Sequence, residues 1–241
     1  MYIQIYHLMN AVKLYLTQKK GIMKPLIIKY AIHSPLCNLN NRVPGLIDLT
    51  NIIPDVYSSY PKNEHHWTTS YVWNKFIPRL ADDIALPFNY DEYKLVPCIY
   101  DNQCLDYHIP IDDSIITIHD LYYNQSYDIP ISNTVFYHNY KSPFNASTGY
   151  HKLFMCAHRC ATIYNKYSKT NRNLLLNTDS MSVPLMHILM CYFRNILILD
   201  NRTNTSYKSY IHEFMQHDNL TYMELFIADS YNFHKYAINL K

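Results

Sequence analysis

The chain has 241 residues, of which 49% are hydrophobic and 17% charged, and a formal net charge of +2. This composition excludes an intrinsically disordered chain, and a total of three glycines excludes a collagen-like or glycine-rich flexible one. The near-neutral charge argues against nucleic-acid binding, because neutralising phosphates requires clustered Lys and Arg. The 25 tyrosines fit either an AT-rich coding bias or a surface that faces carbohydrate, since tyrosine combines an apolar ring with a polar tip.

The first predicted element is a helix at residues 1–16, on which Ile5, Leu8 and Val12 share one face. No basic segment precedes this apolar stretch and no small-residue cleavage site follows it, so a signal peptide is not expected. No transmembrane segment is expected either, because the chain has no run of about 18 apolar residues. The missing signal favours the cytoplasm, while the compartment and the oligomeric state stay open.

Short apolar strands alternate with helices along the rest of the chain. Strands are expected at 26–32, 174–176, 195–199 and 223–228, and helices at 67–80, 150–167, 184–192 and 206–215. Thr68 or Thr69 is expected to cap the helix at 67–80. Residues 86–140 are interpreted as a loop-rich β insertion in a single domain 1–241, with a strand-like run at 114–118. This order predicts an α/β fold in which helices cover both faces of a mostly parallel sheet, a three-layer α/β/α sandwich.

The first candidate for chemistry is a serine that follows the strand at 174–176. Ser180 lies where the chain leaves the carboxyl end of a buried strand, the place where ligands bind in open α/β sheets. A helix expected to begin near Val183 would direct its free N–H groups at this turn. The backbone N–H of Ser180 or Met181 is then a candidate oxyanion donor. The alternative is that Asp179 or Ser180 is only the N-cap of that helix.

The second candidate is the pair Glu64 and His66. A serine nucleophile needs a base, and an imidazole base needs a carboxylate that orients it. Because Glu64 and His66 are two positions apart, they can converge on one side of an extended segment. The alternative is that His65 and His66 are ordinary surface or core residues in a chain with 13 histidines.

Together these two elements resemble a known family. An acidic residue, Glu64, followed by His65-His66-Trp67 and a helix, and much later a strand ending in Asp179-Ser180, is similar to the SGNH-hydrolase-like acyltransferases of the alginate O-acetyltransferase type, also called DHHW proteins. The acid-x-His element precedes the serine, as in the circularly permuted order of that family. The resemblance loosely covers residues 11–85 and 150–228, and it implies an SGNH- or flavodoxin-like α/β/α sandwich.

The resemblance implies a role for each residue of the motifs. Ser180 would be the nucleophile, His66 the base and Glu64 the orienting acid of O-acetyl transfer or ester hydrolysis on a carbohydrate, with no cofactor. Arg202, which follows a strand expected beside that of Ser180, and Arg159 are candidates for contacts with substrate oxygens. For both arginines the alternative is a structural salt bridge or a solvated loop.

Two other functions are weighed against this one. Glu64 replaces the aspartate that is usual in the family, and none of the three residues directly before Ser180 is a glycine. The same fold therefore also fits a catalytically inactive module that binds glycans or a protein partner. A metal enzyme is disfavoured, because His65 and His66 are adjacent and the six cysteines form no C-x-x-C pair. The resembled family is mostly extracytoplasmic, in contrast to the missing signal peptide.

Overall fold

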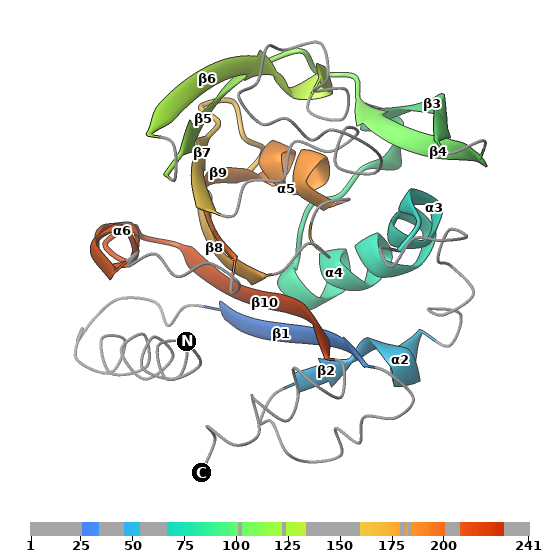
Figure 1. Ribbon diagram of the computed structural model, residues 1–241, viewed down its shortest axis with the longest axis horizontal. Coiled ribbons are helices and arrows are strands. Elements are labelled where there is room, and N and C mark those ends of the chain that lie inside the picture. The colour runs from blue at the N-terminus through green and yellow to red at the C-terminus, as the bar shows by residue number, and fades with distance from the viewer. Residues whose placement is uncertain are drawn as a thin grey trace.

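The computed structural model describes residues 26–33, 46–53, 67–100, 103–121, 124–133, 160–178, 182, 185–200 and 208–228. Within these ranges the chain forms an eight-stranded sheet and a separate two-stranded sheet (Figure 1). The strand order of the large sheet is β2-β1-β10-β8-β9-β7-β5-β6. Its strands are β1 (Leu26–His33), β2 (Leu46–Asp48), β5 (Ile115–Asp120), β6 (Gln125–Pro130), β7 (Cys160–Tyr164), β8 (Arg172–Thr178), β9 (Phe193–Asp200) and β10 (Leu220–Ala228). The small sheet is the hairpin of β3 (Tyr93–Tyr100) and β4 (Gln103–Pro110).

Parallel pairing dominates the large sheet. β2, β1, β10, β8 and β9 run parallel to one another, and β7, β5 and β6 extend the sheet in antiparallel pairing. The strands predicted at 26–32, 174–176, 195–199 and 223–228 are β1, β8, β9 and β10. Their nearly continuous apolar runs are typical of parallel strands that are buried on both faces. The predicted α/β fold with a mostly parallel sheet is confirmed.

The helices match the predicted ones at three places. The run of α3 (Thr69–Tyr71), the π-helix η2 (Val72–Phe76) and α4 (Ile77–Ile84) corresponds to the helix predicted at 67–80. The Thr68 hydroxyl accepts a hydrogen bond of 3.1 Å from the Tyr71 N–H, so Thr68 is the cap. α5 (Met186–Tyr192) and α6 (Lys208–Phe214) correspond to the helices predicted at 184–192 and 206–215. The remaining short elements are α2 (Leu49–Ile52), η3 (Tyr90–Glu92) and η4 (Ile131–Asn133).

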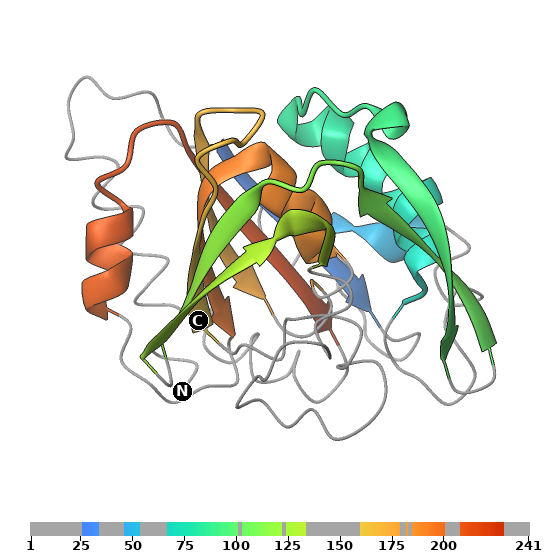
Figure 2. The same ribbon diagram turned by 90° about the horizontal axis from the view of Figure 1, so that it is seen from above.

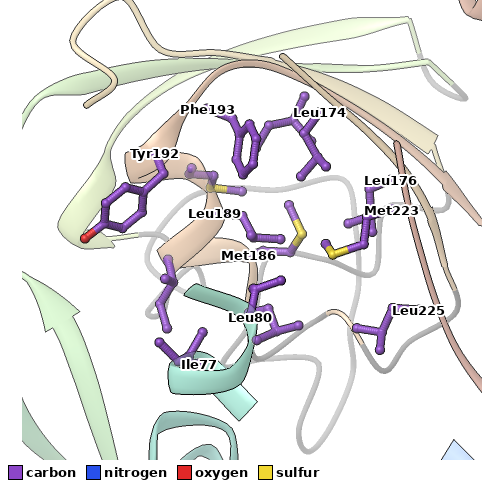
Figure 3. Close-up of a cluster of buried hydrophobic side chains, with 14 of the residues drawn as sticks. Ile77, Leu80, Leu174, Leu176, Met186, Leu189, Tyr192, Phe193, Met223 and Leu225 are labelled. Carbon is purple, nitrogen blue, oxygen red and sulfur yellow. The ribbon is translucent and has the colours of Figure 1, made fainter. Parts of the chain in front are cut away.

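Alternate residues of the central strands face two different helical layers. On one face Leu174, Leu176 and Met223 pack against α4 and α5 (Figure 3). On the other face Leu175 and Tyr222 belong to a cluster with Ile211, Phe214 and Met215 of α6 and the residue after it. Figure 1 shows α4 and α5 inside the curve of the sheet and α6 outside it. The central strands therefore form the middle of the three predicted layers.

One prediction about secondary structure needs correction. The helix predicted at 150–167 is wrong over 160–167, because Cys160–Tyr164 is β7 and pairs antiparallel with both β5 and β9. The interpretation of 86–140 as an inserted β segment stays a prediction, and its second hairpin, β5–β6, extends the large sheet through β7. The predicted helix at 1–16 lies outside the described residues. The assignment of the whole chain to a single domain remains a prediction.

Other residues supply the left-handed backbone positions that glycine commonly occupies. The chain has three glycines in all, and Ala85, Asn124 and Asn219 have φ angles of 48°, 53° and 52°. Asn tolerates this region because its short polar side chain can bond locally, whereas Ala carries the full strain of its Cβ. Ala85 ends α4, and its N–H donates to the carbonyl oxygens of Ala81 and Asp82. Chain reversal at this helix end is therefore achieved with a strained residue.

Candidate functional site at the carboxyl edge of the parallel strands

The carboxyl ends of the central strands meet in one row. Thr178, the last residue of β8, lies opposite Asp200 of β9 on one side and Leu225 of β10 on the other. Leu225 lies in turn opposite Tyr30 of β1. Alternation along β8 puts Thr178 on the face of Leu174 and Leu176, which is the face covered by α4 and α5. Tyr30, Leu225 and Thr178 thus stand side by side on the inner face near the edge where ligands bind in such sheets.

Ser180 itself lies outside the described residues, but both ends of its short connection are described. Thr178 before it and Ser182 after it are each only 2% exposed. α5 begins at Met186, and Leu185 is its N-cap residue. The N-cap of α5 itself is thus Leu185, whereas Asp179 and Ser180 lie outside the described residues, so a capping role for them at the turn before α5 stays an alternative. Thr178 and Ser182 are thus two buried residues four positions apart in the sequence, the first of them at the carboxyl end of β8.

Glu64 and His66 also lie outside the described residues, and Trp67 is the first described residue after them. The Trp67 side chain is fully buried, with its ring 5.0 Å from that of Phe76. Phe76 lies edge-on to Tyr30, with ring centroids 5.1 Å apart. The residue next to His66 is thus connected through one aromatic ring to the same row and face of the sheet as Thr178.

Arg202 and Arg159 are outside the described residues as well, but the strands beside them are informative. β9 ends at Asp200, opposite Thr178, so the prediction that these two strand ends are neighbours is confirmed. β7 begins at Cys160, opposite Leu199 of β9, so it starts at the same edge. In the sequence, Arg202 follows Asp200 by two positions and Arg159 directly precedes Cys160.

The hairpin β3–β4 is attached to this region by an aromatic cluster. Trp73 of η2 stacks on His108 of β4, with centroids 3.8 Å apart and planes 4° from parallel. His187 of α5 lies beside His108, and burial lowers the pKa of His187 to about 4. The π-helical turn matters here because an i→i+5 turn changes the direction of the side chains that follow it. In Figure 2 both green hairpins have their turn ends on the same side as the arrowheads of the parallel strands.

A polar chain in the sheet was not predicted from the sequence. Asn177, Tyr222 and Glu224 are buried on the α6 side of β8 and β10, and the Tyr222 hydroxyl donates a 2.5 Å hydrogen bond to Glu224 Oε1. Tyr222 and Glu224, two positions apart on β10, share one face and are a signal in the sequence, but only the pairing of β10 with β8 brings Asn177 beside them. Asp120, a further buried carboxylic residue, ends β5 at the same edge of the sheet.

The described residues lack the features of two other classes of protein. No group of three or more His, Cys, Asp or Glu side chains that could hold a metal ion occurs among them. Among the same residues, every helix is too short or too polar to cross a membrane. Cys160 and Cys191 are buried, and burial raises the pKa of Cys191 to about 12.

Comparison with known proteins identifies similar folds. No family model and no curated protein matches the chain. The solved structure of Bacillus cereus PatB1 with a sulfonyl adduct superposes with a TM-score of 0.63 at 14% identity, covering 95% of this chain and 90% of that one. Another structure of Bacillus cereus PatB1 gives a TM-score of 0.61 at 13% identity, covering 100% of this chain and 90% of that one. A DHHW family protein from Eubacterium siraeum gives 0.52 at 13% identity, covering 91% and 83% of the two chains. The chain therefore shares its fold with PatB1 and with a DHHW family protein.

Proposed function

We propose that the chain is a serine-dependent enzyme of O-acyl transfer or ester hydrolysis on a carbohydrate, with Ser180 as nucleophile, His66 as base and Glu64 as the carboxylate that orients the base. The observation that carries the proposal is the shared row of Tyr30, Leu225 and Thr178. The connection that contains Ser180 leaves the sheet at one end of this row, and the segment that follows His66 rests on the other end through Phe76.

The comparisons support the same chemistry. A sulfonyl adduct forms when a nucleophile displaces the leaving group of a sulfonyl reagent, and PatB1, which has a similar fold, has been solved with one. Activated serine is a typical protein nucleophile for such electrophiles. The carbohydrate acceptor follows from the resemblance of Glu64-x-His66-Trp67 and Asp179-Ser180 to the alginate O-acetyltransferase type.

The proposed reaction has two balanced half-reactions. The Ser180 Oγ attacks the ester carbonyl carbon while His66 takes the hydroxyl proton, and backbone N–H groups at Ser180 or Met181 bind the oxyanion. Collapse of the tetrahedral intermediate breaks the ester bond, and His66 returns the proton to the departing alcohol. An acceptor hydroxyl then attacks the acyl carbon and loses its proton to His66; the bond between this carbon and Ser180 Oγ breaks, and His66 returns the proton to Oγ. A sugar acceptor makes the enzyme a transferase, and water makes it an esterase.

The test is covalent labelling with a fluorophosphonate or a sulfonyl fluoride, followed by peptide mass spectrometry. We expect one label on the peptide that contains Ser180, lost in Ser180→Ala and retained in the control Ser209→Ala, which changes an exposed serine on α6. Release of p-nitrophenol from p-nitrophenyl acetate, with and without oligosaccharide acceptors, then separates esterase from transferase. A folded protein that takes no label would overturn the proposal and favour the inactive binding module.

A further inference from the structure

Three polar side chains form a hydrogen-bonded chain between β8 and β10. The Asn177 Nδ2 group donates a long bond of 3.5 Å to the Tyr222 hydroxyl, which donates a bond of 2.5 Å to Glu224 Oε1. The exposed fractions of the three residues are 3%, 0% and 8%. The register pairs Tyr222 with Leu175 and Glu224 with Asn177, so all three side chains lie on the face that α6 covers.

The surroundings of these three polar side chains are apolar. The same face contains Leu175, Leu197 and Leu199, together with Phe214 of α6. Burying an amide, a phenol and a carboxylic group in such a layer is unfavourable unless their polar atoms are hydrogen-bonded. Apolar side chains of similar volume commonly stabilise a core as well or better. A buried polar chain at this place therefore points to a need for one defined geometry rather than for extra stability.

The position of Asn177 indicates which part of the backbone the three hydrogen-bonded side chains fix. Asn177 precedes Thr178, the last residue of β8, and lies three positions before Ser180. We infer that Tyr222 and Glu224 are positioning residues, which hold Asn177 and thereby the exit of β8 that carries the proposed nucleophile. This inference rests on the proposed function. The hydrogen bond from Tyr222 to Glu224 orients the phenol oxygen, and that oxygen in turn holds the Asn177 amide.

Small displacements of the carboxyl end of β8 matter for catalysis at Ser180. A nucleophile and its base act at a separation of about 3 Å, and a misplacement of about 1 Å lowers rates on the order of a hundredfold. Ser180 is two positions beyond Thr178 in the sequence, and Thr178 and Ser182 on either side of it are buried, so we expect a shift at the end of β8 to displace Ser180. Loss of the Tyr222 hydroxyl should therefore lower kcat for an acetyl ester and leave KM unchanged.

The main experiment compares Tyr222→Phe with the pair Glu224→Gln and Glu224→Met. Gln keeps an acceptor oxygen for the Tyr222 hydroxyl at the same length, whereas Met keeps the length without it. We expect Tyr222→Phe and Glu224→Met to lower kcat and the fluorophosphonate labelling rate at least tenfold at unchanged KM, and Glu224→Gln to stay within twofold of the wild type. Tyr210→Phe, at an exposed tyrosine, is the control for the loss of a phenol oxygen.

Hydrogen exchange of the peptide 176–185 provides a readout that does not depend on catalysis. We expect faster exchange there in Tyr222→Phe and Glu224→Met than in Glu224→Gln or Tyr210→Phe. Unchanged exchange and unchanged labelling in a folded Tyr222→Phe would overturn the inference, and so would a Glu224→Gln protein as impaired as Glu224→Met. If the wild type takes no label, the proposed function fails. Hydrogen exchange then decides by itself whether Tyr222 and Glu224 fix the carboxyl end of β8. If Tyr222→Phe does not fold, the two Glu224 variants decide.

Discussion

Tyr30 and Thr178 stand in the same row of the sheet, two strands apart, with Leu225 between them. Strands in a sheet are about 4.8 Å apart, so the two backbones are separated by roughly 10 Å. Tyr30 supports Phe76 and, through it, the buried Trp67 next to His66, while Thr178 ends the strand that leads to Ser180. Two segments more than a hundred residues apart in the chain are thus attached to neighbouring points of one face.

The position of Tyr30 is maintained by a polar contact with α4. Its hydroxyl donates a 2.8 Å hydrogen bond to Asp83 Oδ2, which also accepts a 2.6 Å bond from Arg79 Nε. Burial, reinforced by Asp83, raises the pKa of Tyr30, so the phenol stays a donor. We expect Tyr30→Phe to lower the free energy of unfolding by about 1.5–3 kcal/mol, the typical range for a hydrogen bond to a charged group. Urea denaturation measures this, and Tyr210→Phe, at an exposed site, should change stability by less than about 0.5 kcal/mol. Equal stability of Tyr30→Phe and wild type would contradict the importance of this contact.

The proposed base makes the reaction rate depend on pH. His66 must be neutral to take the serine proton, so ester hydrolysis should rise through the ordinary titration range of histidine, near pH 6.5, and level off above it. The measurement is kcat/KM for p-nitrophenyl acetate between pH 5 and 8. His66→Gln should reduce the rate at least a hundredfold, in line with the loss of a general base. A rate that does not change with pH would remove His66 from this role.

Stability should depend on pH through a different histidine, His187 on α5. Burial lowers the pKa of His187 to about 4 in the folded protein, whereas in the unfolded chain it is about 6.5. The unfolded state therefore binds the proton first as pH falls, and the stability that the neutral ring provides is present above pH 6.5 and is lost toward pH 4. Between pH 7 and pH 5 the loss should be about 2 kcal/mol.

The change His187→Gln tests this dependence, because it removes the titrating ring. The difference in unfolding free energy between pH 7 and pH 5 should shrink by about 2 kcal/mol in this variant. His217→Gln, which changes an exposed histidine, is the matched control and should keep the dependence of the wild type. An unchanged dependence in His187→Gln would show that the ring does not titrate as its burial implies.

The strained end of α4 allows a stabilising substitution. Ala85 has a φ of 48° and is exposed, so its Cβ causes strain without making core contacts. We expect Ala85→Gly to raise the unfolding free energy by about 0.5–1 kcal/mol, because glycine enters the left-handed region without that strain. Ala81→Gly, inside the same helix, should lower stability by about 1 kcal/mol. Thermal unfolding of both variants measures the contrast, and destabilisation of similar size at both positions would refute the argument.

Local patterns were sufficient for the central strands and for most of the helices. The apolar runs of β1, β8, β9 and β10, and the polar start of the helix at Thr68, are properties of neighbouring residues. The same patterns misassigned 160–164 as helix, because its pairing partners, β5 and β9, are about forty residues away on either side. They also missed that β5–β6 extends the large sheet, since strand pairing between distant segments is not encoded in the period of one segment.

The sequence by itself determined the α/β class and the location of Ser180 after a buried strand, because both depend on hydrophobic periodicity and on the order of elements along the chain. The tertiary structure alone decided that the ends of β8 and β9 and the start of β7 share one edge, and that Trp67 is connected through Phe76 to Tyr30 in the row of Thr178. It also joined Asn177 to Tyr222 and Glu224, 45 or more positions away. Such contacts form only when the strands have paired, since the register between two strands, and not the composition of either, decides which side chains meet.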